Sequence, residues 1–322
     1  MKKRYWLAGA SGVAGAALAA RMLARPRDVR WEEQREHLRH AGRSRFVEIE
    51  GARLHYHEAG DPGAPPVVLL HGFVASNFVW RDVLVPLADA GLRAVAPDLL
   101  GSGFSAKPRG GGYTIETQAR VVVGLLDALG IGRATLVGSS YGGAVAAVCA
   151  LDYAERVGRL VLVGAVTNDR ILRHPLLRAL RVPLVGELLS PVMFDVRQLA
   201  KRRRWRSLAL ARGMSFDERE FTSEHRALRA AATHRAAVRT ARRWSAARVE
   251  RDAHLIGQPT LIVWGGRDQY LPLSDAERLR ESIPRSRLFV FRDAGHTPQE
   301  DHPAEFAALV ADFCRQGLES GV

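Results

Sequence analysis

Gly138-Ser139-Ser140-Tyr141-Gly142-Gly143 is the stretch that decides the fold of this chain. It fits the pattern G-x-S-x-G and lies between an apolar run, residues 133–138, and an alanine-rich run, residues 142–153. Small residues around the serine let the chain turn sharply from a strand into a helix, and this turn lifts the serine Oγ above the sheet. The pattern therefore predicts a strand, a tight turn and a helix, with Ser140 as a nucleophile. An ordinary strand–helix turn that contains a serine is the alternative.

Apolar runs alternate with helical patterns on both sides of this turn. Short apolar runs predict strands at residues 66–70, 93–96, 133–138, 160–163, 260–264 and 287–291. Helical patterns predict helices at residues 78–90, 117–129, 142–153, 274–281 and 303–315. Residues 46–49 and 53–57 flank Gly51 and predict a hairpin. Strands that alternate with helices indicate an α/β fold with a mostly parallel sheet and helices on both faces.

The composition of the 322 residues is that of a globular protein, with 47% hydrophobic and 25% charged side chains. It excludes a wholly disordered chain and a protein with many membrane spans. The two cysteines, Cys149 and Cys314, are far apart, which excludes a disulfide-rich scaffold and a zinc site built from cysteines. The length suits one large α/β domain or two small ones.

The net charge of +13 is confined to two segments. Residues 1–45 carry a net +7 and residues 168–254 a net +11, whereas the rest of the chain carries −5. A strongly basic protein is expected to meet nucleic acid, an anionic membrane or an acidic substrate. In this chain the excess of positive charge lies only in residues 1–45 and 168–254, and the remainder is mildly acidic. The charge therefore says nothing about a partner of the remainder.

The first 24 residues predict a membrane anchor or an export signal. Lys2, Lys3 and Arg4 precede an uncharged run of 16 residues that is rich in alanine and glycine and ends at Arg21. Such a start is typical of a secretory signal, and as a helix the run would span about 24 Å, short of the roughly 30 Å hydrocarbon core. An uncleaved anchor, a cleaved signal and a surface helix of a cytosolic protein are the three interpretations, in that order. Residues 25–45 are polar and basic, and they predict a solvated tether.

A serine nucleophile needs a general base, and the last loop of the chain supplies a candidate. His296 lies in Asp293-Ala294-Gly295-His296-Thr297-Pro298, just after the final expected strand. Position rather than residue type selects it, because the chain has 11 histidines. Asp268 follows the strand at 260–264 and would orient the imidazole and stabilise its protonated form. Asp169 is the alternative acid, and the alternative role of Asp268 is to cap a helix.

The tetrahedral oxyanion of acyl transfer needs two hydrogen-bond donors. The backbone N–H of Tyr141, directly after the nucleophile, is one candidate. The N–H of Phe73 is the second, because His71-Gly72-Phe73 follows the strand at 66–70. We interpret His71 as a structural residue of this loop rather than as a second base.

Together these motifs resemble the α/β-hydrolase superfamily over about residues 46–322. The resemblance also rests on Trp80, on Glu300 and Pro303, and on Pro97-Asp98-Leu99-Leu100-Gly101-Ser102-Gly103-Phe104-Ser105-Ala106-Lys107-Pro108. The set looks like the branch with epoxide hydrolases, haloalkane dehalogenases, C–C bond hydrolases of meta-cleavage products and small esterases. This resemblance implies an eight-stranded sheet with a helical lid after the sixth strand. Residues 46–167 and 255–322 would then form the hydrolase core, and residues 168–254 the lid.

Ser140, at the centre of the G-x-S-x-G turn, restricts the reactions that this resemblance implies. Epoxide hydrolases and haloalkane dehalogenases use an aspartate nucleophile, whereas this chain has Ser140. A serine with a histidine base suits acyl transfer to water through an acyl-enzyme. We therefore expect a serine hydrolase of a carboxylic ester or related acyl bond. A C–C bond hydrolase, a cofactor-free perhydrolase or haloperoxidase, and a non-catalytic binding protein with the same fold are the alternatives.

The expected lid combines an apolar and a basic portion. Residues 170–190 are rich in leucine and valine, and we expect them to line the acyl pocket, with simple packing on the core as the alternative. Lys201-Arg202-Arg203-Arg204-Trp205-Arg206 follows, and then the arginines of a helix-like stretch at 224–247. A solvated face, docking to an anionic membrane surface and nucleic-acid binding compete to explain this charge, and no nucleic-acid-binding module accompanies it.

The sequence indicates no cofactor and no metal. Gly110-Gly111-Gly112 lacks the strand and the Lys-Ser/Thr of a phosphate-binding loop, and His55 and His57 have no third partner nearby. The expected partners are a small, apolar acyl substrate and an anionic membrane surface, without nucleic acid. The expected location is at the membrane through the N-terminal segment, or outside the cytoplasm after export.

Overall fold

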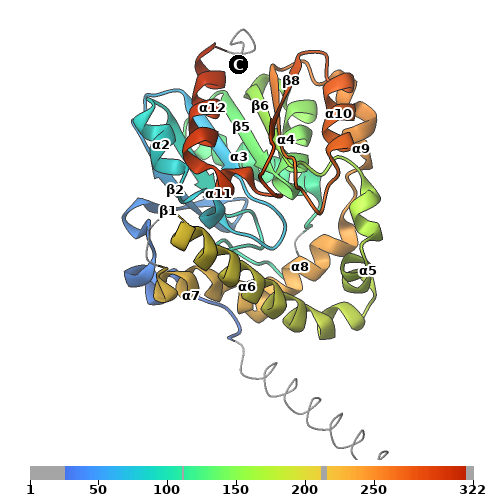
Figure 1. Cartoon of the computed structure of the whole chain (residues 1–322). Coiled ribbons are helices and arrows are strands. Elements are labelled where there is room, and N and C mark those ends of the chain that lie inside the picture. Colours follow the sequence, from blue (N-terminus) through green and yellow to red (C-terminus); the bar gives the residue numbers. More distant parts are fainter. Residues whose placement is uncertain (1–25, 111, 212–215, 317–322) are drawn as a thin grey trace, which may run out of the picture.

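An eight-stranded sheet lies at the centre of the molecule (Figure 1). The computed structural model describes residues 26–110, 112–211 and 216–316, so the predicted anchor or signal at residues 1–24 lies outside the described chain. The strand order is β1-β2-β4-β3-β5-β6-β7-β8. β2 is antiparallel to both β1 and β4, and the other neighbouring strands are parallel. The mostly parallel sheet expected from the sequence is confirmed.

The central strands are buried because helices cover both faces of the sheet. β5 and β7 are buried along their whole length, which explains why they read as continuous apolar runs. The strands are β1 (Ser44–Ile49), β2 (Ala52–Ala59), β3 (Pro66–Leu70), β4 (Arg93–Pro97), β5 (Ala134–Ser139), β6 (Val157–Val163), β7 (Thr260–Gly265) and β8 (Ser286–Phe291).

Two apolar clusters, one on each face, join the sheet to its helices. The core helices are η4 (Asn77–Trp80), α2 (Leu84–Asp89), α3 (Ile115–Ala128), α4 (Tyr141–Asp152), η5 (Ala154–Arg156), α10 (Leu273–Ser282), α11 (Pro298–Asp301) and α12 (Pro303–Gln316). One cluster contains α2 and α12, and the other contains α3, α4 and α10. The single helix predicted at 78–90 is wrong, because Pro86 is tolerated only in a first helical turn and α2 begins at Leu84.

A helical insertion, residues 168–254, joins β6 to β7 and covers the end of the sheet where the parallel strands finish (Figure 1). Its elements are η6 (Asp169–Arg173), α5 (Pro175–Arg181), α6 (Val185–Ala211), α7 (Glu218–Arg226), η7 (Ala227–Arg229), α8 (Ala231–Arg243) and α9 (Ala247–Asp252), with η8 (Ala253–Leu255) at its end. The continuous helix expected at 224–247 is wrong, because Ala230 has an extended backbone. The chain turns there, and Thr233 Oγ and His234 Nε2 bond the freed carbonyl oxygens of Ala227 and Leu228.

Residues 26–45 pack against the rest of the molecule, unlike the solvated tether predicted. They form η1 (Trp31–Glu33), η2 (Arg35–His37) and η3 (Ala41–Arg43). Val29 and Leu38 are buried, although their spacing has no period that would have marked them as core. The carbonyl oxygens of Pro26 and Arg27 accept hydrogen bonds from the N–H groups of Ala231 and Ala232, at 2.9 and 3.0 Å. The described chain therefore starts against the first turn of α8.

Candidate active site

Ser140 occupies a strained turn between β5 and α4. Its φ of 55° is unusual for a residue other than glycine. Two hydrogen bonds hold the turn: Ser140 N–H donates to Val163 O at 2.9 Å, and Val166 N–H donates to Ser140 O at 3.0 Å. Glycine is needed two residues on, because a Cβ on Gly142 would lie 2.3 Å from Leu70 O. The strand–turn–helix predicted for this motif is therefore present.

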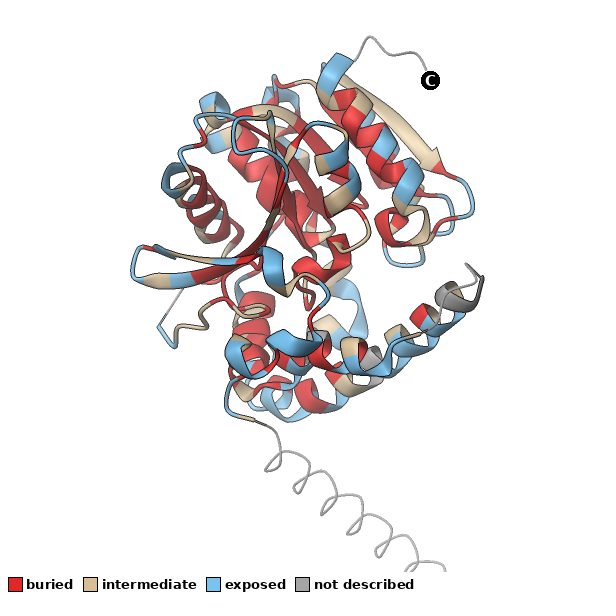
Figure 2. Cartoon of the chain, turned by 90° about the vertical axis from the view of Figure 1, so that its left-hand side faces the viewer, coloured by how far each residue is buried: buried red, intermediate tan, exposed pale blue. Residues whose placement is uncertain are grey.

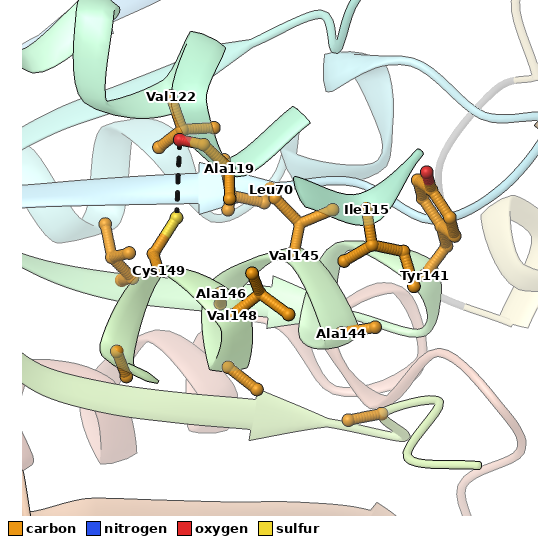
Figure 3. Packing of buried hydrophobic residues seen from close by; sticks show 14 of the residues in the cluster. Leu70, Ile115, Ala119, Val122, Tyr141, Ala144, Val145, Ala146, Val148 and Cys149 are labelled. Carbon is orange, nitrogen blue, oxygen red and sulfur yellow. Dashed lines mark hydrogen bonds between the residues drawn. The ribbon is translucent and has the colours of Figure 1, made fainter. Parts of the chain in front are cut away.

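Helix α4 gives Ser140 a rigid support. Ten of its 12 residues are buried, because it is packed between the sheet and the neighbouring helices. Figure 3 shows Val145 and Cys149 of α4 packed beside Ala119 of α3, with the Cys149 Sγ 3.7 Å from the Ala119 carbonyl oxygen. A helix that is apolar on all sides belongs in a core, so the alanine-rich run after the serine fits this place.

Asp268 and His296 form a hydrogen-bonded pair. Asp268 follows β7 and His296 follows β8, and the distance from His296 Nδ1 to Asp268 Oδ2 is 2.7 Å. The other carboxylate oxygen of Asp268 accepts from the N–H groups of Tyr270 and Leu271, at 2.8 and 3.1 Å. The carboxylate is almost fully buried, whereas 16% of the His296 side chain is exposed. Because Asp268 occupies Nδ1, Nε2 is the imidazole nitrogen left to accept a proton.

The turns that follow neighbouring strands bring Ser140 and His296 to one place. Gly164 follows β6, and a Cβ on it would lie 3.4 Å from His296 Nδ1. The residue before it, Val163, accepts the hydrogen bond from Ser140 N–H. Gly72 approaches Ser140 from another direction, because a Cβ on it would lie 3.2 Å from Ser140 Cβ. Parallel strands end at the same edge of a sheet, so residues distant in sequence converge there.

The other candidate acid and bases have different partners. Asp169 accepts hydrogen bonds from Ala246 N–H at 2.6 Å and from Ser245 Oγ at 3.3 Å, so it fixes a turn of the insertion. His71 is buried, its Nε2 accepts from Leu99 N–H at 3.0 Å, and its Nδ1 donates to Gly72 O at 2.8 Å. Burial lowers the pKa of His71, and these bonds fit a neutral structural residue, as expected. His302, the histidine that follows His296 in the sequence, pairs with Asp293 at 3.2 Å.

The two candidate oxyanion donors flank Ser140. Within the described residues, neither Phe73 N–H nor Tyr141 N–H donates to a backbone carbonyl. A cavity of about 20 Å³ next to them has room for about one water. It is also lined by Thr233, Ala237 and Thr240 of α8. Burial raises the pKa of the Tyr141 phenol, which therefore stays neutral beside the site.

The expectation that residues 170–190 line an acyl pocket is wrong for most of their large apolar side chains. Leu176, Leu184 and Leu188 are exposed to 50%, 77% and 53%. Helix α8 instead supplies the side chains of the insertion that line the cavity, because its small residues allow close approach to the sheet end. Apolar composition alone does not distinguish a side chain that faces the core from one that faces outwards.

The short helix α11, directly after His296, connects the site to its surroundings, and sequence reasoning gave it no role. Gln299 Nε2 donates to Ser139 Oγ at 3.2 Å, next to Ser140. Asp301 Oδ2 accepts from Gly295 N–H at 2.9 Å, next to His296, and its Oδ1 accepts from Arg204 of α6 at 2.5 Å. The sequence did hold a signal for this contact. Glu300 and Asp301 follow His296, and the basic run at residues 201–206 offers cations that could pair with them.

Glu300 of α11 is a buried carboxylate held by cations. Arg81 donates to it at 2.9 Å, and Arg204 lies 3.7 Å away. Burial raises the pKa of Glu300, but Arg81, Lys201 and Arg204 outweigh it and hold the pKa at about 2. Part of the basic run 201–206 is thus turned inwards to core carboxylates, which the sequence did not indicate.

Metal coordination has no ready site in this arrangement. In the part of the chain that the structure describes, no three His, Cys, Asp or Glu side chains are grouped to hold a metal ion. Likewise, no helix among residues 26–110, 112–211 and 216–316 is long and apolar enough to cross a membrane.

The sheet order, the strained serine turn and the Asp–His pair define a hydrolase of the α/β class. Comparison with known proteins agrees: residues 65–303 match the family described as alpha/beta hydrolase fold. The chain belongs to this family, and the resemblance seen in the sequence is confirmed.

Relatives within the family differ in chemistry. The chain is 33% identical to 2-hydroxymuconate semialdehyde hydrolase of Pseudomonas sp. (strain CF600), over 84% of this chain and 93% of that protein. It is 32% identical to haloalkane dehalogenase 2 of Mycobacterium bovis, over 84% and 94%. A crystal structure described as a membrane phospholipase A, a novel bacterial virulence factor, matches with a TM-score of 0.69 and 26% identity, over 98% of this chain and 100% of that one.

Proposed function

We propose that this protein is a serine hydrolase that cleaves a carboxylic ester, with Ser140, His296 and Asp268 as catalytic triad. The observation that carries the proposal is the Asp268–His296 pair at 2.7 Å, which packs against the Val163–Gly164 turn that also holds Ser140 at positive φ. Ser140, Asp268 and His296 occur in the chain order of this fold class. A serine at the elbow favours acyl transfer over the alkyl-ester chemistry of an aspartate nucleophile.

The first half of the reaction forms an acyl-enzyme. Ser140 Oγ attacks the ester carbonyl carbon while His296 Nε2 takes the hydroxyl proton. Asp268 stabilises the imidazolium that results, and the N–H groups of Phe73 and Tyr141 stabilise the oxyanion. Collapse of the tetrahedral intermediate breaks the bond to the alcohol, which leaves with the proton from His296.

The second half returns the enzyme to its starting state. His296 takes a proton from water, which attacks the acyl carbon on Ser140. The second tetrahedral intermediate uses the same two N–H donors, and the carboxylic acid leaves as Ser140 regains its proton from His296. No cofactor enters either half.

We also propose that the protein works at a membrane surface. The uncharged run behind Lys2, Lys3 and Arg4 supports this location. So does the likeness to the structure described as a membrane phospholipase A, since that likeness spans 98% of this chain. An apolar, lipid-like acyl substrate fits both the uncharged N-terminal run and the likeness to that structure.

C–C bond hydrolysis is the second candidate function. The 33% identity to 2-hydroxymuconate semialdehyde hydrolase favours it. The two candidates are separated by assaying a chain-length series of nitrophenyl esters beside a meta-cleavage product.

A fluorophosphonate probe tests the nucleophile, because it labels an activated serine covalently. We expect stoichiometric labelling of the protein at Ser140. We expect the unlabelled protein to turn over the esters, and the labelled protein to lose this activity. Turnover of the meta-cleavage product alone would replace the ester proposal with C–C hydrolysis. Absence of labelling and of both activities would contradict a hydrolase role for this site.

A further inference from the structure

Most of the large apolar side chains that this molecule exposes lie on one part of the helical insertion. Ten large hydrophobic residues are exposed among the described ones, and eight of them fall between residues 176 and 199. The other two, Leu255 and Tyr270, lie well away from this segment in the sequence. Scattered exposed apolar residues are ordinary, whereas such a concentration marks an interaction surface.

These side chains form a stripe on the outer side of α6. Val185, Leu188, Leu189 and Val192 are exposed by 39%, 53%, 39% and 41%, and their spacing of three and four places them on one helix face. Val182 and Leu184 extend the stripe just before the helix begins. We name these six residues the outer apolar stripe. Gly186, Ser190 and Phe194 are buried, so the opposite face of α6 makes the contact with the protein.

The charges around the stripe fit an anionic membrane. Glu187 is the carboxylate that lies between the stripe residues in the sequence. Arg242 neutralises it through two contacts of 2.7 Å, and this hydrogen bonding lowers the Glu187 pKa. Further along the same helix face, Arg203 and Arg206 are exposed, and in the described chain neither pairs with a carboxylate. An apolar helix face continued by cations is typical of helices that lie in the interface of anionic lipids.

The start of the described chain lies on the same side of the molecule as the stripe. Pro26 and Arg27 bond the first turn of α8, which packs against α5 and α6. The chain therefore enters the fold at the insertion, and Figure 1 shows the first described residues beside the insertion helices. The uncharged run at residues 5–20 ends only six positions before Pro26, so a membrane that held this run would face the insertion.

We infer that the outer apolar stripe inserts into the interface of an anionic bilayer and holds the insertion, with the sheet end beneath it, against the lipid. This inference deepens the proposed membrane location and rests on it. The carboxyl ends of the strands then face the membrane, and an acyl chain reaches the serine without crossing bulk water. Figure 2 shows the exposed segments of the insertion helices on the side away from the buried sheet.

Depth-dependent quenching in the full chain tests the inference. A fluorophore is attached to Leu188→Cys, or to the control Leu255→Cys, where the leucine is 65% exposed. Cys314→Ser removes the half-buried thiol, and the buried Cys149 stays unlabelled. Vesicles contain phosphatidylglycerol and phosphatidylcholine with brominated or ordinary acyl chains. We expect at least about twofold quenching by brominated lipid at position 188, because an interfacial helix sinks its apolar face about 5–10 Å, and none at position 255.

The inference is overturned by equal quenching at both positions or by none at position 188. It is also overturned if two copies of the chain cross-link through position 188 in vesicles, because a second copy would then cover the stripe. Arg203→Gln with Arg206→Gln should reduce quenching on anionic vesicles and leave it unchanged on phosphatidylcholine alone.

A second measurement separates this inference from the proposed activity. Leu184→Glu with Leu188→Glu should lower turnover of phospholipid in vesicles by about tenfold or more and leave turnover of a soluble nitrophenyl ester within about twofold. Leu255→Glu should change neither. Ester turnover without quenching at position 188 would refute the docking and keep the hydrolase. Quenching at position 188 without any ester turnover would refute the proposed ester hydrolysis and keep the docking.

Discussion

Ser140 sits in a backbone conformation that only its surroundings maintain. Hydrogen bonds to Val163 and from Val166 fix it on one side, and the Gly72 backbone lies against its side chain on the other. Strain of this kind costs on the order of 1–3 kcal/mol and is found mostly where function needs it. The backbone N–H of Tyr141 then points from the start of a helix, where N–H groups have no partner within the helix.

Removal of the Ser140 hydroxyl should abolish turnover and leave the fold intact. Alanine tolerates this backbone about as well as serine, so the free energy of unfolding should change little. We expect Ser140→Ala to lose about 10⁴–10⁶ in kcat, as found for other triad serines. Steady-state ester kinetics and fluorophosphonate labelling measure the loss, and labelling that persists in the variant would refute the assignment.

Gly142 should resist even the smallest side chain. A Cβ there would lie 2.3 Å from the Leu70 carbonyl oxygen, and that oxygen belongs to the strand before the Phe73 loop. We expect Gly142→Ala to cost about 3 kcal/mol of unfolding free energy and to displace both oxyanion donors. Urea denaturation measures the cost. Gly132→Ala is the control, since a Cβ at Gly132 meets nothing within 4 Å, and equal stability of the two variants would contradict the argument.

At the scale of elements, α11 joins the loop that carries His296 to the insertion. Three of its four residues make these bonds: Gln299 bonds Ser139, the residue before Ser140, Glu300 bonds Arg81, and Asp301 bonds both Gly295 and Arg204. One short helix thus ties α6 to the peptide before His296. The position of the insertion and the position of the imidazole are therefore mechanically linked.

Loss of Arg204 should loosen this link. Arg204→Gln leaves the Asp301 carboxylate without its charged partner on α6, so the loop that carries His296 gains freedom. We expect kcat on a soluble ester to fall roughly tenfold with KM little changed, less than the roughly 100-fold that a 1 Å misplacement can cause.

The neighbouring Arg203→Gln is the matched control for this prediction. Arg203 is exposed, and in the described residues it pairs with no carboxylate. Its removal should leave soluble-ester kcat unchanged. Equal effects of the two substitutions, or a change in KM alone at Arg204, would show that charge near the site matters and the link does not.

At the scale of the whole molecule, ion pairs between opposite charges hold the insertion against the hydrolase core. The insertion carries a net +11 and the hydrolase core a net −5, and buried Glu300 receives cations from both: Arg81 from the core and Arg204 from the insertion. Part of the basic excess thus holds the insertion on the sheet, as the pairs of Arg170 with Asp275 and of Arg248 with Asp152 also do.

Glu300 should make stability depend on pH. Its pKa in the folded protein is about 2, below the ordinary 4.5, so its contribution is fully present above pH 4.5 and is lost as pH falls towards 2. Glu300→Gln should therefore destabilise the protein most near neutral pH and progressively less below pH 4.5. Urea unfolding at several pH values measures this difference, and a difference that grows on acidification would contradict the prediction.

The sequence by itself determined the fold class, the elbow at Ser140 and the loops that carry Asp268 and His296. It could do so because apolar runs of strand length and a G-x-S-x-G turn report local requirements of the backbone. Only the tertiary structure decided that Arg204 faces Asp301, that the outer apolar stripe faces outwards and that residues 26–45 pack against the rest of the molecule. Those outcomes depend on which surfaces meet across long stretches of chain, and an apolar or basic residue is equally compatible with either side until the partner surface is in place.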